Sequence, residues 1–289
     1  MPSMKKHEES VKFYINVFTL ALPIAVQSLI TIGVNMLDTM MVGRLGDSAL
    51  SATSLANSFI SVFQIFCMGL GMGASVLVSR YWGIKKSESG EKEQEDALRA
   101  LKQTVCLVIR LNLILAAAFA LATFFAPDLV MRMYTGKRNL IRLGVYYFNY
   151  SVPTYFFVGL SLVITIVLRS VGQVLYPLLV SIGAFFVNLL MNYMFIFGKF
   201  GAPEMGVSGA ALGTLIARIF EFTLILGYLF FIDKKIGFRI KDLLMKTGSL
   251  FFEYVRISIP VLVSDGILAL GTNAVAMVIG RLSETFMAA

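Results

Sequence analysis

Long uncharged, apolar runs alternate with short charged segments along the chain. Residues 13–37, 48–79, 111–127, 143–168 and 170–198 each lie between successive charges. Most of these runs are long enough to cross a membrane, since about 20 helical residues span the hydrocarbon core. They lack the period-two alternation that the shorter strands of a membrane barrel require. The pattern therefore predicts an all-α integral membrane protein.

Two further apolar runs contain isolated charges. Residues 207–232 include Arg218 and Glu221, and residues 257–280 include Asp265. Arg218 and Glu221 stand three residues apart and share a helical face, which predicts a structural ion pair that lowers the cost of both charges in lipid. Counting these runs, seven transmembrane helices are predicted, at about residues 15–41, 52–79, 104–126, 143–168, 174–198, 207–232 and 256–280.

Composition and charge agree with this class. Hydrophobic residues make up 57% of the chain and charged residues only 15%, whereas about a quarter of a soluble domain is charged. Most of the 25 Lys and Arg residues lie on the side of the N-terminus. This bias predicts a multi-pass protein of the cytoplasmic (inner) membrane with its N-terminus in the cytoplasm. The net charge of +8 is thus a topology signal, and a nucleic-acid partner is not expected.

The polar segments and the cysteines offer little chemistry of their own. Residues 233–255 interleave basic with apolar side chains, which suits either a helix lying on the anionic leaflet or a plain connector. Cys67 and Cys106 fall in or beside apolar helices and are expected to be packing residues. Together with the single His7 they provide no metal-ligand cluster, and no catalytic set is evident. Neither an enzyme nor a bound cofactor is expected.

The two ends of the chain carry a similar phrase. When Pro23 is placed on Pro260, Gly43-Arg44-Leu45 falls on Gly280-Arg281-Leu282 without a gap. A repeat that restarts at the seventh helix predicts a six-helix lobe over residues 1–232, a cytoplasmic linker over 233–255 and the first helix of a second, parallel lobe over 256–289. Parallel repeats of this kind are found in transporters. The chain is therefore expected to be incomplete, with a second lobe as its missing partner.

Five motifs follow one another in an order that resembles a known family. They are "LPIAVQSL…NMLDTMMVGRLGDSALSA", "GLGMGASVLVSRYWG", "LRSVGQVLYPLL", "NLLMNYMFIFGKFGAPEMGVSGAALGT" and "SIPVLVSDGIL". Over nearly its whole length the chain is similar to the multidrug and toxic compound extrusion (MATE) family of cation-coupled efflux transporters, which have two six-helix lobes. The resemblance implies a six-helix bundle that forms one lobe, followed by the first helix of the other.

The resemblance also implies a set of residues for cation or proton coupling. Asp38 matches the acidic residue of the family's first helix. The other positions that it implies are Asn188, Asn192, Thr214, Tyr147 and, in the seventh helix, Asp265; Tyr146 and Tyr150 compete with Tyr147. Members of one branch have Asp where this chain has Asn192. Because an amide cannot release a proton, this departure leaves Asp38 as the one matched acid of the lobe.

The chemistry of these groups suits ion exchange. A charged carboxylate is costly in a low-dielectric site unless a cation or hydrogen-bond donors accompany it, so Asp38 could trade a proton or Na⁺ for a cationic substrate. The side-chain oxygens of Asn188 and Asn192 could help to hold Na⁺. The alternatives are that Asp38 is a helix-end residue at the outer interface, solvated or paired with Arg44, and that the Asn residues and Asp265 serve structural pairing between helices.

The sequence therefore predicts a secondary active transporter: an antiporter that exports organic cations or drugs by alternating access, driven by Na⁺ or H⁺, in contact with membrane lipid. Two other functions stay open. One is a lipid-linked oligosaccharide flippase of the same superfamily, for which more cationic cavity residues would be expected. The other is a membrane subunit that interacts but does not transport.

Overall fold

The computed structural model describes residues 2–87 and 90–282, and all regular structure within these ranges is helical. The α-helices are α1 (Pro2–Gly43), α2 (Asp47–Lys86), α3 (Glu91–Phe125), α4 (Pro127–Tyr134), α5 (Arg138–Ser151), α6 (Thr154–Ser170), α7 (Leu175–Phe197), α8 (Val207–Gly227) and α9 (Gly248–Leu282). A π-helical turn, η1 (Tyr228–Ile232), extends α8, and a 3-10 turn, η2 (Ile240–Leu244), precedes α9. The all-α prediction is confirmed.

The predicted membrane spans correspond to these helices with one correction. Within the described residues, six helices are long and apolar enough to cross a membrane, and a seventh span results if the bent pair α5 and α6 is counted as one. The run 143–168, predicted as one straight helix, is instead divided at Val152 and Pro153, where the axes differ by 60°. Pro153, which lacks the N–H that would continue the helical hydrogen bonds, stands at this break.

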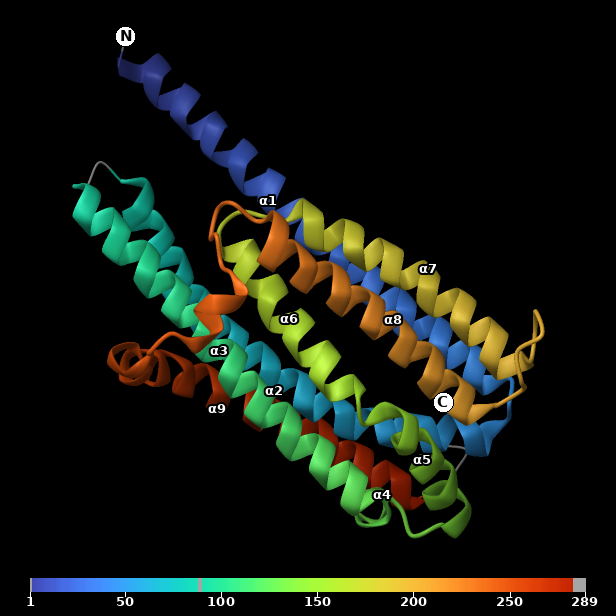
Figure 1. Cartoon of the computed structure of the whole chain (residues 1–289). Helices are drawn as coiled ribbons and strands as arrows, with labels where there is room; N and C mark the ends of the chain where they lie inside the picture. Colours follow the sequence, from blue (N-terminus) through green and yellow to red (C-terminus); the bar gives the residue numbers. More distant parts are fainter. Residues whose placement is uncertain (1, 88–89, 283–289) are drawn as a thin grey trace.

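The helices form two groups with α6 between them (Figure 1). α7 packs against α8 and α1 on one side, while α2 packs against α3 and α9 on the other. α6 contacts α2, α3 and α8, and α5 contacts α2 and α8. The N-terminal part of α1 extends beyond the other helices (Figure 1). Residues on α1, α2, α5, α6 and α8 can therefore face a common space.

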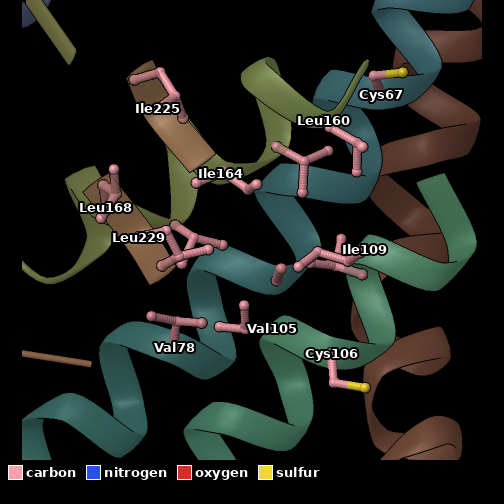
Figure 2. Packing of buried hydrophobic residues seen from close by; sticks show 14 of the residues in the cluster. Cys67, Val78, Val105, Cys106, Ile109, Leu160, Ile164, Leu168, Ile225 and Leu229 are labelled. Carbon is pink, nitrogen blue, oxygen red and sulfur yellow. The ribbon is translucent and has the colours of Figure 1, made fainter. Parts of the chain in front are cut away.

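Apolar side chains of α2, α3 and α6 form the main core. Figure 2 shows Val78 of α2, Val105 of α3, Ile164 of α6 and Leu229 of η1 in this cluster; all four are buried. Because lipid tails are as apolar as these residues, association within a membrane depends on close packing and interhelical hydrogen bonds rather than on burial alone. Cys67 and Cys106 are free thiols buried in the bundle, which confirms their predicted role in packing.

Glycines allow α2 to approach two neighbours closely. A Cβ atom on Gly73 would collide with the Ser258 side chain of α9, and Gly69 faces the same helix. A Cβ atom on Gly71 would instead lie 2.5 Å from Cδ1 of Ile166 on α6. The three glycines thus serve two faces of α2.

The linker between α8 and α9 is packed against the bundle. Ile236 and Phe238 are buried, and Asp233 accepts hydrogen bonds from the backbone N–H groups of Ile236 and Gly237 at 2.9 and 3.0 Å. These two side chains therefore enter the protein core, whereas Leu244 and Phe252 of the same segment are 86% and 80% exposed, so the choice between a leaflet-bound segment and a plain connector stays a prediction. α9 begins at Gly248, earlier than the predicted 256.

Basic residues bind the linker to α3 and to η1. Lys102 of α3 forms an ion pair with Asp242 at 3.0 Å. Arg110 of α3 donates to the backbone oxygen of Leu243 at 2.6 Å, and Arg239 donates to that of Phe230 at 2.7 Å. The positive charge near this segment therefore satisfies carbonyl and carboxylate oxygens of the chain itself.

Candidate functional site

A polar cavity of about 350 Å³ lies between α1, α2, α5, α6 and α8. Hydroxyl and amide side chains predominate among its lining residues. Of the described residues that line it, Asp38 and Arg218 are the charged ones. A hydrogen-bonding cavity among membrane-spanning helices is costly unless it serves water, ions or a ligand, so it is the candidate functional site.

Asp38 lies on α1, about one turn before the helix ends, and faces this cavity. Its Oδ1 accepts a hydrogen bond from Nδ2 of Asn192 on α7 at 2.6 Å. The same nitrogen donates to Oδ1 of Asn188 at 3.3 Å. Arg44, the alternative partner of Asp38, is exposed after the end of α1. The predicted Asp38, Asn188 and Asn192 are therefore brought together in the structure.

The amide of Asn192 is held in one orientation by its surroundings. The residue is fully buried, and its Oδ1 has no hydrogen-bond partner. This oxygen lies against Gly213 of α8, where a Cβ atom would collide with it. Glycine at 213 thus makes room for the amide, and the nitrogen side is presented to the two oxygens of Asp38 and Asn188.

Tyr147 is the tyrosine of α5 that reaches the cavity. Its hydroxyl donates to Oδ1 of Asn57 on α2 at 3.0 Å, and the side chain is buried. Tyr146 and Tyr150, the competing candidates, are 50% and 37% exposed. Helical spacing turns these two away from the bundle, so Tyr147 is the residue that can act at this site.

α8 contributes Thr214 and Arg218, which stand four residues apart and line the same cavity. Nη1 of Arg218 donates to Oε2 of Glu221 at 2.8 Å, so the predicted ion pair is present. Arg218 also lines a second, smaller cavity of about 30 Å³ together with Asn188 and Glu221. The guanidinium therefore stands between two compartments, a position that the ion pair alone did not indicate.

Asp265 is the predicted site residue that the structure leaves apart. It is partly buried on α9, which packs against α2, and it is not among the residues that line either cavity. α9 also contacts α4, where the hydroxyl of Tyr134 donates a hydrogen bond to Oδ1 of Asn273 at 2.6 Å.

Sequence reasoning missed the wall that α2 provides. Its polar side chains Ser54, Asn57, Ser58, Ser61 and Gln64 all line the cavity. They recur at intervals of three and four residues within an otherwise apolar run, which places them on one helical face. This spacing is the feature of the sequence from which the polar face of α2 could have been predicted.

Comparison with known proteins bears on this arrangement. The model of the MatE family matches residues 23–194, more than half of the chain. The chain belongs to the MatE family. The matched range includes Asp38, Tyr147, Asn188 and Asn192, whereas Arg218 lies beyond its end.

Two curated relatives are named as multidrug resistance proteins. The chain is 28% identical over 254 residues to a "Probable multidrug resistance protein NorM" of Thermotoga maritima, covering 87% of this chain and 52% of that protein. It is 26% identical over 283 residues to a protein of the same name from Neisseria meningitidis, covering 94% and 57%. The chain thus spans about half the length of the curated relatives it matches.

Solved MATE structures share the fold. An outward-facing multidrug resistance MATE transporter gives a TM-score of 0.73 at 20% identity, covering 86% of this chain and 52% of that one. An inward-facing MATE transporter also gives 0.73, at 21% identity, covering 94% and 59%.

Proposed function

We propose that this chain forms part of an antiporter that exports organic cations or drugs across the cytoplasmic membrane by alternating access, in exchange for Na⁺ or H⁺. Membership of the MatE family and the multidrug resistance names of its relatives support this proposal. Because the chain spans about half of those relatives, the activity is proposed for the assembled transporter, in which a second lobe completes the substrate path.

The observation that carries the proposal is the position of Asp38. Its carboxylate faces a polar cavity and accepts a hydrogen bond from Asn192. A carboxylate in such a site is stable when a proton, Na⁺ or a cationic substrate accompanies it. If it can hold only one of these partners at a time, entry of the inorganic ion drives release of the cargo.

Oxygen donors around Asp38 suit a small hard cation. Asn188 supplies an amide oxygen beside Asp38, whereas Asn192 turns its amide nitrogen to the carboxylate; Thr214 and Tyr147 supply hydroxyl oxygens that line the cavity. Na⁺ is a substrate here, bound and released in each cycle. Within the part of the chain that the structure describes, no group of three or more His, Cys, Asp or Glu residues could hold a metal.

The charge of the cavity favours cationic cargo over the pyrophosphate of a lipid-linked oligosaccharide. Among the described lining residues Arg218 is the positively charged one, and Glu221 already pairs with it. A flippase for a pyrophosphate would need several unpaired basic side chains there. The proposal therefore remains cation export.

Efflux of ethidium from whole cells tests this function. We expect that cells expressing the full-length gene with Asp38→Asn lose efflux down to the level of the empty vector, because the amide still accepts the Asn192 hydrogen bond but carries no charge. Glu95→Gln, at an exposed acidic residue of α3, is the control and should pump like the wild type. Equal efflux by wild type and Asp38→Asn would contradict the proposed coupling role.

A further inference from the structure

Three charged side chains from α1 and α8 surround the two cavities. Asp38 lines the larger cavity, Glu221 lines the smaller one, and Arg218 lines both. The Arg218 and Glu221 side chains are only 24% and 13% exposed. Arg218 is thus placed between two carboxylates and is bound, in this structure, to Glu221.

The net charge of this group is one negative unit. Among the described residues that line the two cavities, Asp38 and Glu221 are the acids and Arg218 is the base. An unbalanced charge among membrane-spanning helices is costly, and one monovalent cation at Asp38 would balance it. Because residue 192 is Asn, the second acid of this site is Glu221, and its charge is already compensated by Arg218.

We propose that Arg218 is a tethered counter-ion that alternates between Glu221 and Asp38 and thereby competes with the monovalent cation for Asp38. This inference rests on the proposed function. The structure shows the guanidinium paired with Glu221, and in this scheme that is the arrangement when a cation occupies Asp38. When the cation leaves, the guanidinium turns toward Asp38 and balances the charge of the carboxylate.

Arg218 is placed for this exchange. It borders the space that Asp38 faces, and its hydrogen bond to Glu221 uses one terminal nitrogen, Nη1. Arginine carries five N–H donors in a planar fork and stays charged throughout. The movement that the proposal requires is a shift of this charge from the smaller cavity toward the larger one.

If Arg218 competes with the cation, substitutions of Arg218 and of Glu221 should change Na⁺ affinity in opposite directions. Arg218→Gln removes the competitor and leaves two carboxylates, so Na⁺ should bind about tenfold more tightly or better. Glu221→Gln frees Arg218 to pair with Asp38, so Na⁺ should bind about tenfold more weakly. The double variant again has one net negative charge and should return toward the wild-type affinity. Arg218→Lys keeps the positive charge and should not tighten binding.

Thermal unfolding of the purified full chain in detergent measures this affinity. Cys67 and Cys106 are both buried and free, so a fluorogenic thiol reagent reports unfolding. The melting temperature is recorded against Na⁺ concentration at fixed pH, with choline replacing Na⁺ to hold ionic strength constant. Asp38→Asn should abolish the Na⁺ response in every background.

The sign of the two single-variant effects tests the inference. Changes of Na⁺ affinity in the same direction, or no change in either variant, overturn the proposal. An Arg218→Gln chain without any Na⁺ response overturns it as well. Loss of ethidium efflux is a separate readout, so a failure of the transport proposal remains distinguishable from a failure of this one.

Discussion

At the scale of single residues, Asn192 defines the chemistry of the lobe. Its amide nitrogen donates to both Asp38 and Asn188, and Gly213 makes room for its oxygen on the other side. The nitrogen thus bridges two oxygens in the way that a small cation could. Asn192 supplies a fixed hydrogen-bond donor where a second acid would supply an exchangeable charge.

Asn192→Asp should convert this fixed donor into a second cation ligand. Two adjacent carboxylates repel each other unless a cation lies between them, so Na⁺ should bind about tenfold more tightly, or roughly 1.4 kcal/mol. Na⁺-dependent melting of the purified chain measures the change. Asn139→Asp, exposed at the start of α5, is the matched control and should leave affinity unchanged. A Na⁺ response equal to that of the wild type in Asn192→Asp would count against a cation site at Asp38.

The residues of the site were predictable to different degrees. Asp38 and Asn192 stood out because a carboxylate and an amide are rare in apolar helices and because the family motif marks them. The serines of α2 did not stand out, since a helical hydroxyl can bond its own backbone: Ser58 donates to the Ser54 oxygen at 3.0 Å and Ser61 to the Asn57 oxygen at 2.8 Å. Such residues can face lipid, another helix or a cavity. Which of these environments each serine faces is seen only in the packed bundle.

At the scale of helices, proline did not decide where a helix ends. Pro23 and Pro260 lie inside the continuous helices α1 and α9, whereas Pro153 marks the break between α5 and α6. A proline in a membrane helix frees a backbone oxygen, and neighbouring helices determine whether that oxygen is satisfied with a small or a large bend. The hydropathy pattern alone could therefore predict the span but not its 60° break.

Gly73→Ala should weaken the contact between α2 and α9. The added Cβ would collide with the side chain of Ser258 and would lie 3.0 Å from its Cα, so the helices must separate. The expected cost is about 1–3 kcal/mol, seen as a lower melting temperature of the purified chain. Gly83→Ala, on the same helix with nothing within 4 Å of the new Cβ, should be neutral or stabilising by about 0.5–1 kcal/mol. Equal melting temperatures for the two variants would refute the close packing at Gly73.

At the scale of the whole molecule, the spans were predictable and the linker was not. A membrane helix must satisfy its backbone internally, so an apolar run of sufficient length leaves little choice of structure. The linker contains Phe238 and several basic residues, which would suit a membrane surface equally well. Its true course depends on Asp233 and Asp242 capping nearby backbone N–H groups, and a carboxylate in a polar segment does not reveal such partners in advance.

Asp242→Ala should loosen the linker. The change removes the ion pair with Lys102 and the hydrogen bond from the Arg239 backbone N–H at 2.9 Å. Trypsin should then cleave at the basic residues of this segment several times faster, because cleavage follows the population of the locally open state. Gel analysis of timed digests gives the rate. Asp96→Ala, at an exposed acid of α3, is the control; identical digestion of both variants would show that Asp242 does not fasten the segment.

The break between α5 and α6 has a consequence for what lines the cavity. Tyr147 and Ser151 precede the break and Thr154 follows it, yet all three line the same cavity. The break therefore lies in the cavity wall, and the 60° angle between the two helices places hydroxyl groups from both of them in the compartment that Asp38 faces.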